Sequence, residues 1–287
     1  MTQVTNPTTP QSSVPNPPGQ GQLIIGRQDA NRLNGTNGDD IILTFGGNDL
    51  ISALGGNDLA IAGGGNDTIV LGAGNDAAFA GTGNDVVAGG DGDDRIFGGK
   101  GADLLDGGAG NDLVSGDQGN DTALGGSGND SVYGGQGSDV VGGGEGNDSV
   151  YGGKGNDTVD GGAGNDFVSG DRGSDVLTGG AGNDTFYFAS IGGDFGVDTI
   201  VDFTASEDKI RLKQGGAFAG LGGTFEASEF VVISGFTPAN PGAATANKLI
   251  YDPQSGALYF NAGGPTAVTV AVLQTGLTIT SSNFELF

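Results

Sequence analysis

The middle of the chain repeats one pattern of polar and apolar positions every nine residues. An Asp stands at each ninth position from Asp40 to Asp184, in 17 consecutive copies that cover Gly35 to Tyr187. Two residues before each Asp there is a Gly. Two residues after it there is Val, Ile or Leu in 13 copies and Ala or Phe in the other four. A fixed period of this kind is typical of a solenoid, whose units bury apolar side chains only by stacking on their neighbours.

Each unit predicts a Gly-rich turn followed by a short strand. The Gly-x-Gly-Asn-Asp stretch suits a turn because Gly and Asn accept positive φ. The next three residues, such as Thr158 to Asp160, are long enough only for a short strand, whose middle side chain can point inward. Two units per coil give an 18-residue period and two facing parallel sheets. The expected inward side chains form two stacks: Ile42, Ala60, Ala78, Ile96, Val114, Val132, Val150, Val168 and Phe186 on one sheet, and Ile51, Ile69, Val87, Leu105, Ala123, Val141, Val159 and Leu177 on the other.

Composition and charge narrow the chemistry. The 287 residues include 62 Gly and 9 Pro, near the level at which an aperiodic chain is disordered, so the strict period is what favours order. The absence of Cys and His excludes His-based catalytic triads, thiolate nucleophiles and the usual zinc sites. A net charge of −25 argues against nucleic acid as a partner and for cations. We therefore expect a protein that is not an enzyme.

The repeated Asp residues predict calcium binding. Stacking brings carboxylates 18 residues apart to about 4.8 Å from each other, one strand spacing, where like charges repel. A hard divalent cation between successive turns removes this repulsion. Calcium accepts 6–8 oxygen ligands from carboxylates and carbonyls, which Gly-rich turns expose, whereas magnesium keeps its waters in a tight octahedron.

The repeat resembles the RTX (haemolysin-type) calcium-binding nonapeptide. The stretch Gly152 to Asp160, Gly-Gly-Lys-Gly-Asn-Asp-Thr-Val-Asp, carries the resemblance most clearly. The resemblance implies an all-β fold, a right-handed parallel β-roll (a β-solenoid) closed by a C-terminal β-rich cap. It also implies Ca²⁺ ions between turns one coil apart, held by Asp carboxylates and turn carbonyls.

The copies differ in their leading glycines, which predicts sites of unequal strength. Thr44-Phe45 and Ala53-Leu54 replace the Gly pair, and three further early copies lack the first Gly. A Cβ at a positive-φ position costs about 1 kcal/mol or more. We expect weak binding or none at Asp40, Asp49, Asp58, Asp67, Asp76 and Asp85. The expected strong ligands are Asp94, Asp103, Asp112, Asp121, Asp130, Asp139, Asp148, Asp157, Asp166, Asp175 and Asp184, with Gly90, Gly92, Gly99, Gly101, Gly108, Gly110, Gly126, Gly128, Gly135, Gly137, Gly144, Gly146, Gly153, Gly155, Gly162 and Gly164 in their turns. The gaps between stacked turns set a ceiling of about fifteen ions.

The compositional zones predict three parts. Residues 1–33 are a flexible polar leader without a basic or apolar run, so no N-terminal signal peptide is expected. Residues 34–188 form the roll, and no stretch of the chain is long and apolar enough for a transmembrane segment. Residues 189–287 form the C-terminal β cap and the secretion-target region.

The last part contains its own strand signals and a second resemblance. A β-hairpin is expected from Lys248–Tyr251 and Ala257–Phe260, followed by a strand at Val268–Leu273. Aromatic residues of this region are expected in its core: Phe186, Phe188, Phe203, Tyr251, Tyr259, Phe260 and Phe284. The segment 184–212 resembles the closing segment of RTX rolls in exported proteins. Asn283–Phe287 resembles the C-terminal export signal of type I secretion targets. Carboxylates at Asp194, Asp198 and Asp202 are expected to be solvated or to cap backbone groups, or alternatively to hold one further ion.

These features predict an exported calcium-binding RTX protein with a structural, surface or matrix role. Its expected partners are calcium ions, the type I secretion machinery and an extracellular polysaccharide or surface layer, and its expected location is outside the cell. The alternative is an RTX carbohydrate-binding module without its own catalytic domain, which needs a basic or aromatic stripe. The candidates for that stripe are Arg95, Lys100, Lys154, Arg172, Phe79, Phe97, Tyr133 and Tyr151. An ice-binding solenoid needs a regular Thr row, and Thr68, Thr122, Thr158 and Thr185 are too irregular for one.

Overall fold

The computed structural model describes residues 3–5, 20–189, 195–213, 218, 220–221, 225–239, 245–264 and 266–287. It divides into two compact units, residues 1–149 and 150–287. The strands are β1 (Gln3–Thr5), β2 (Leu23–Ile25), β3 (Arg32–Asn34), β4 (Ile41–Leu43), β5 (Leu50–Gly55), β6 (Leu59–Gly64), β7 (Thr68–Ala73), β8 (Ala77–Thr82), β9 (Val86–Asp91), β10 (Arg95–Lys100), β11 (Leu104–Ala109), β12 (Leu113–Gln118), β13 (Thr122–Ser127), β14 (Ser131–Gln136), β15 (Val140–Glu145), β16 (Ser149–Lys154), β17 (Thr158–Ala163), β18 (Phe167–Arg172), β19 (Val176–Ala181), β20 (Thr185–Phe188), β21 (Asp198–Ile200), β22 (Lys209–Leu212), β23 (Phe230–Val232), β24 (Lys248–Tyr251), β25 (Ala257–Asn261), β26 (Val268–Val272) and β27 (Phe284–Leu286). Two short 3-10 helices are η3 (Ala227–Glu229) and η5 (Ser281–Asn283).

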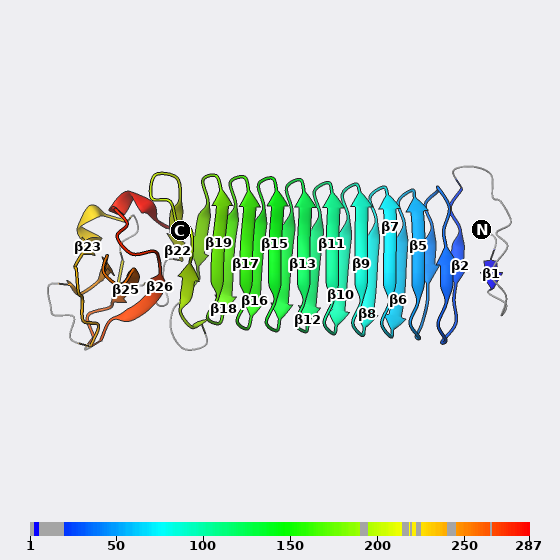
Figure 1. Cartoon of the computed structure of the whole chain (residues 1–287), viewed down its shortest axis with the longest axis horizontal. Coiled ribbons are helices and arrows are strands. Elements are labelled where there is room, and N and C mark those ends of the chain that lie inside the picture. Colours follow the sequence, from blue (N-terminus) through cyan, green and yellow to red (C-terminus); the bar gives the residue numbers. More distant parts are fainter. Residues whose placement is uncertain are drawn as a thin grey trace. The chain divides into compact units, whose positions relative to one another are not determined.

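The first unit is a parallel β-roll with two strands in each coil. The even-numbered strands up to β14 form one parallel sheet, and the odd-numbered strands from β3 to β15 form the other. Strands of the two sheets run in opposite directions (Figure 1). Partners are 18 residues apart, as where Ile96 pairs with Ala78 on one side and Val114 on the other. This register confirms the predicted two-unit coil.

The strands are longer than the sequence predicts. From β5 to β19 each has six residues and continues through the following Gly pair, instead of ending three residues after the Asp. The extension exists because the second residue of the Gly pair also pairs with its counterparts in the coils on both sides. Gly99 pairs in this way with Gly81 and with Asp117.

The core consists of the side chains that point between the two sheets. All the residues predicted to point inward are 0–1% exposed, which confirms both stacks. Each six-residue strand also points its fourth residue inward. In β5 to β8 this fourth residue is Ala53, Ala62, Leu71 and Ala80, and Thr44 takes the same place directly after β4. The side chains of these five residues are at most 3% exposed. In β9 to β15 it is Gly. We call residues 41–82 the double-row coils and residues 86–145 the single-row coils.

The roll begins before the first Asp copy. Strand β2 and all but the last residue of β3 lie in the segment expected to be a flexible leader, and each strand pairs in parallel with the strand 18 residues later. Ile24 and Leu33 are 2% and 1% exposed and extend the two inward stacks. Gln22 and Asn31 occupy the positions that Asp fills in later coils.

The second unit contains parallel coils of the same kind and then antiparallel strands. Strands β18, β20, β22 and β27 follow one another in one parallel sheet, and β17, β19, β21 and β26 in the other. Strands β24 and β25 form the expected antiparallel hairpin, and β25 pairs antiparallel with β26. The aromatic side chains expected in the core of this region are at most 9% exposed, which confirms that expectation. In the part of the chain that is described, no helix is long and apolar enough to cross a membrane.

Candidate metal centre

The Asp residues of the repeat form two buried ladders along the roll. Each Asp directly precedes a strand and is 1–3% exposed. Its Oδ1 accepts a hydrogen bond from the backbone N–H of the Asp one coil earlier, as from Asp112 to Asp130 at 2.7 Å and from Asp103 to Asp121 at 2.8 Å. In the first unit one ladder contains Asp40, Asp58, Asp76, Asp94, Asp112, Asp130 and Asp148, and the other contains Asp49, Asp67, Asp85, Asp103, Asp121 and Asp139.

The second carboxylate oxygen of most ladder residues is buried without a hydrogen-bond partner. This holds for Oδ2 of Asp49, Asp58, Asp67, Asp76, Asp85, Asp94, Asp103, Asp112, Asp121, Asp130, Asp175 and Asp184. An unsatisfied buried polar atom costs about 1–3 kcal/mol, and more when the group is charged. A long series of such atoms at one repeated position therefore points to a ligand that supplies positive charge.

From Asp94 onward, a glycine five residues before the Asp leaves open the space beside this oxygen. At Gly125 a methyl group would lie 2.5 Å from Oδ2 of Asp130 and 2.6 Å from the carbonyl oxygen of Gly143. At Gly116 it would lie 2.5 Å from Oδ2 of Asp121 and 2.6 Å from the carbonyl oxygen of Gly134. A carboxylate oxygen and a carbonyl oxygen of the next coil thus border one small space, which we call the cradle. Hard oxygen donors of this kind fit Ca²⁺.

Backbone carbonyl groups are available as further ligands at such a site. Among the described residues, no three Asp, Glu, His or Cys side chains come together as a metal-binding group. The predicted turn glycines Gly90 to Gly164 all have φ between 104° and 146°, which only Gly adopts easily and which shapes the turns that carry these carbonyls.

The first residue of the Gly pair matters for a different reason than the sequence suggests. We expected Ala62, Leu71 and Ala80 to weaken binding through strain at positive φ. In the later copies, however, this first position (Gly89, for example) does not have positive φ, while the second and fourth do. The side chains of Ala62, Leu71 and Ala80 are therefore not strained at φ, and they occupy the space that forms the cradle in later coils.

Strain is confined to the second residue of the pair. Leu54, Asp117 and Asp171 stand there with φ of 84°, 70° and 65°. Leu54 is one of the residues for which the sequence predicts a cost of replacing glycine, and the structure confirms a left-handed conformation there. Phe45, at the same position of the earliest pair, does not adopt it.

The ladders extend beyond the Asp residues that the sequence identifies. At their start, Oδ2 of Asp40 accepts a hydrogen bond from the backbone N–H of Thr36 at 2.5 Å, so this carboxylate is already satisfied. In the second unit, Asp198 and Asp208 accept hydrogen bonds from the backbone N–H groups of Asp175 and Asp184, both at 3.0 Å. Their spacings of 23 and 24 residues hide them from a search with a nine-residue period.

The remaining acidic candidates of this region have other roles. Asp202 accepts hydrogen bonds from the backbone N–H groups of Gly179 at 2.9 Å and Gly180 at 2.8 Å, which is the expected capping role. Asp194 lies outside the described residues.

Burial and neighbouring carboxylates disfavour the charged form of the ladder. Burial raises the pKa of Asp58, Asp94 and Asp121 to about 7, with further contributions from the carboxylates one coil away. Burial likewise raises the pKa of Asp67, Asp85 and Asp130 to about 6. A bound cation would reverse this effect, because an opposite charge stabilises the carboxylate.

A further ladder, made of exposed Asn side chains, aligns the turns. In many turns the side-chain oxygen of the Asn before the Asp accepts a hydrogen bond from the backbone N–H one coil later, as from Asn75 to Asn57 at 2.8 Å and from Asn129 to Asn111 at 2.9 Å. The exposed Asn ladder therefore points in the opposite direction to the buried Asp ladder. Together they fix the turns of successive coils in register.

Comparison with known proteins gives one family match and several matches among solved structures. The family model for the RTX calcium-binding nonapeptide repeat (4 copies) matches residues 25–60, 43–78, 79–114, 115–150, 134–168, 142–177 and 160–190. No curated protein matches the chain. Among solved structures, the crystal structure of the extracellular lipase LipA from Serratia marcescens is 18% identical with a TM-score of 0.22, over 87% of this chain. The chain spans 40% of the length of that lipase.

The matched segments together cover more than half of the 287 residues and coincide with the Asp ladders and their turns. The chain therefore belongs to the family of proteins built from RTX calcium-binding nonapeptide repeats.

Proposed function

We propose that this protein is exported and folds outside the cell when its roll binds many Ca²⁺ ions, and that the folded roll has a structural, surface or matrix role. One observation carries the proposal. The two ladders present buried carboxylate oxygens without hydrogen-bond partners beside glycine cradles, and the sequence repeats this arrangement coil after coil.

The charge of the roll supports coupling between calcium binding and folding. Residues 34–188 contain 25 acidic and 4 basic residues, a net charge of −21. In the single-row coils each strand buries only one apolar side chain, which has to offset this repulsion. Because a metal that binds only the folded chain adds its binding energy to folding, such coils depend on calcium. Millimolar calcium outside the cell fits the weak class of extracellular calcium modules.

The strong sites are assigned to the coils whose cradles are open. These contain Asp94 to Asp184 and the glycines before them, whereas the filled positions at Thr44, Ala53, Ala62, Leu71 and Ala80 leave the turns of the double-row coils weak or empty. Asp198 and Asp208 are added as further members of the ladders. Because the turns of the double-row coils are weak or empty sites, we expect the number of bound ions to stay below the ceiling of about fifteen set by the sequence.

Circular dichroism tests the coupling directly. The full chain in EDTA is expected to lose most of its strand signal, and millimolar CaCl₂ is expected to restore it. MgCl₂ at the same concentration serves as the control, because Mg²⁺ retains its waters and prefers tight octahedral sites. A strand signal that EDTA leaves unchanged would contradict the proposal.

Export is assigned to the C-terminal segment. Asn283–Phe287 places a polar and an acidic residue among apolar ones, as in type I secretion targets. Removal of residues 283–287 is expected to keep the protein inside cells that carry a type I exporter, whereas the surface variant Ser127→Ala should still reach the medium. Equal amounts of both variants in the medium would contradict this assignment.

The carbohydrate-binding alternative gains support from the position of the aromatic candidates. Phe79, Phe97 and Tyr133 are the third residues of β8, β10 and β14, so they all lie on the outer face of the even-numbered sheet. Lys100 lies on the same sheet, at the end of β10. No catalytic family matches the chain, and we propose no enzymatic activity for it.

A further inference from the structure

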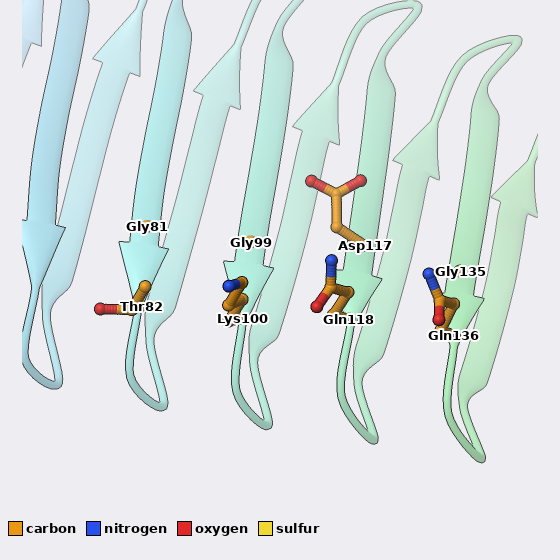
Figure 2. A pocket seen from close by; sticks show the side chains of 8 residues that line it. All are labelled: Gly81, Thr82, Gly99, Lys100, Asp117, Gln118, Gly135 and Gln136. Carbon is orange, nitrogen blue, oxygen red and sulfur yellow. The ribbon is translucent and has the colours of Figure 1, made fainter.

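A groove of about 550 Å³ crosses the outer face of the even-numbered sheet in the first unit. It is lined by the fifth and sixth residues of β8, β10, β12 and β14. The sixth residues are Thr82, Lys100, Gln118 and Gln136, whose side chains stand at matching places on successive strands (Figure 2). A volume of this size is within the range of small-ligand sites.

The chemistry of the groove is polar, and its charges balance. The fifth residues are Gly81, Gly99, Asp117 and Gly135, and three of them have no side chain. The groove therefore contains one acidic and one basic side chain, with two amides and a hydroxyl as hydrogen-bonding groups. The regular pairing of Lys100 with Thr82 and Gln118, and of Gln118 with Gln136, repeats these groups at about 4.8 Å.

An aromatic row runs beside the groove, two residues earlier on the same strands. The rings of Phe79 and Phe97 stack with centroids 5.0 Å apart and planes 7° apart. One face of Phe97 thus meets Phe79, and its other face is turned toward the next coil, where Ser115 stands in register. Ser115 in turn pairs with Tyr133. The row consequently has a gap over Ser115, about two strand spacings (~10 Å) wide between the aromatic positions.

The second unit shows what such a gap accepts. There Ser169 stands in the same sequence context, Val-Ser-Gly-Asp, and Phe167 packs against Tyr151 at 5.8 Å and Tyr187 at 5.1 Å. Ser169 beside it is only 1% exposed. A six-membered ring therefore fits between aromatic side chains that lie two coils apart.

In the first unit the corresponding position is not filled by an aromatic ring. Leu113 stands where Phe167 stands in the second unit, and Ser115 is partly exposed. A further hollow of about 290 Å³ is lined by Leu113, Ser131 and Tyr133 together with charged residues that include Asp94 and Arg95. Ser115 donates a hydrogen bond to Oδ1 of Asp117 at 2.6 Å, so a carboxylate lies beside the gap.

We propose that this face of β8 to β14 binds an uncharged linear polysaccharide. One sugar ring enters the gap over Ser115, where its apolar face meets Phe97, and neighbouring sugars lie along the groove, where Thr82, Gln118 and Gln136 bind their hydroxyl groups. The groove has balanced charges and the chain carries −25, so a polyanionic glycan is disfavoured. The long, open groove fits an extended polymer that continues past its ends. The inference needs the calcium-loaded roll but not its export.

Affinity electrophoresis of the calcium-loaded full chain tests the inference. We expect retardation in gels that contain hydroxyethylcellulose or mixed-linkage β-glucan, and none in gels that contain polygalacturonate. Leu113→Phe fills the gap as Phe167 does in the second unit and should weaken binding about tenfold, which corresponds to about 1.4 kcal/mol. The double variant Gln118→Ala/Gln136→Ala should weaken it to a similar extent.

Matched controls lie on the opposite sheet. Leu104→Phe places the same substitution at the first residue of β11, and Ser127→Ala removes a polar group from the sixth residue of β13; both variants should bind as the unchanged chain does. Retardation only by polygalacturonate, or equal effects of Leu113→Phe and Leu104→Phe, would overturn the inference. So would a lack of retardation by every neutral polymer while circular dichroism shows the calcium-folded roll. A chain that stays unfolded in calcium would overturn the proposed function together with this inference.

Discussion

The first residue of each Gly pair decides what its coil can do. With Gly at this position, a small space remains between a buried carboxylate and a carbonyl of the next coil, as at Gly125. With Ala or Leu, as at Ala62 and Leu71, a side chain joins the core instead. Full burial of a Leu contributes about 1.5–3 kcal/mol. Gly at this position therefore favours metal binding, whereas Ala or Leu favours apolar packing.

Filling one cradle should remove one ion. Gly125 does not have positive φ, so Gly125→Ala adds no backbone strain, but its methyl group would lie 2.5 Å from Oδ2 of Asp130. We expect isothermal titration calorimetry to count about one calcium ion fewer, and circular dichroism in calcium to show an unchanged strand signal.

A control separates this effect from general destabilisation. Ser127→Ala changes a neighbouring residue whose side chain is exposed, and it should leave the number of ions as it is. An unchanged stoichiometry in Gly125→Ala would show that the cradle is not part of the ion site.

At the scale of strands and coils, the periodic features could be predicted and the irregular ones could not. The 18-residue register and both inward stacks follow from the spacing of Asp and apolar residues. Strand length could not be predicted in this way, because pairing through the Gly pair depends on a left-handed conformation at its second residue, which Leu54 also adopts. Asp198 and Asp208 were not identified as ladder members, because longer loops before them break the period. The early β2 and β3 were missed because Gln22 and Asn31 replace Asp.

The raised pKa values of the ladder make the calcium-free roll sensitive to pH. Burial raises the pKa of Asp58, Asp94 and Asp121 from 3.8 to about 7, and that of Asp67 and Asp130 to about 6. The folded chain therefore binds more protons than the unfolded chain between these values and 3.8. Its stability is greatest at low pH and is lost as the pH rises through 6 to 7.

In EDTA we consequently expect the strand signal to increase as the pH falls from 8 to 5. Calcium should act oppositely, because it competes with protons for the same carboxylates, so more calcium is needed at pH 5 than at pH 8 to reach half-maximal folding. Circular dichroism across this pH range, with and without calcium, measures both effects. A calcium-free strand signal that decreases toward pH 5 would show that protonation does not relieve the repulsion among the ladder carboxylates.

Within the first unit, the double-row and single-row coils differ in how much apolar burial stabilises them. The double-row coils bury pairs such as Ile69 with Leu71, whereas a single-row strand buries Val132 beside a glycine. Both kinds carry the same buried carboxylates, so the repulsion is similar while the apolar gain differs. The double-row coils should therefore depend least on calcium, and coils stacked on them gain a preformed edge on which to fold.

Hydrogen exchange can locate this difference along the chain. In EDTA, amides of the double-row coils (residues 41–82) are expected to exchange more slowly than those of the single-row coils (residues 86–145), and calcium should slow exchange in the single-row coils far more than in the double-row coils. Leu71→Gly supplies the test of cause, because it removes a buried side chain from the double-row coils and should speed their exchange in EDTA. The surface variant Ser127→Ala should not. Equal protection of both segments without calcium would mean that the apolar pairs do not hold the early coils together, and that the whole unit orders only when the ions bind.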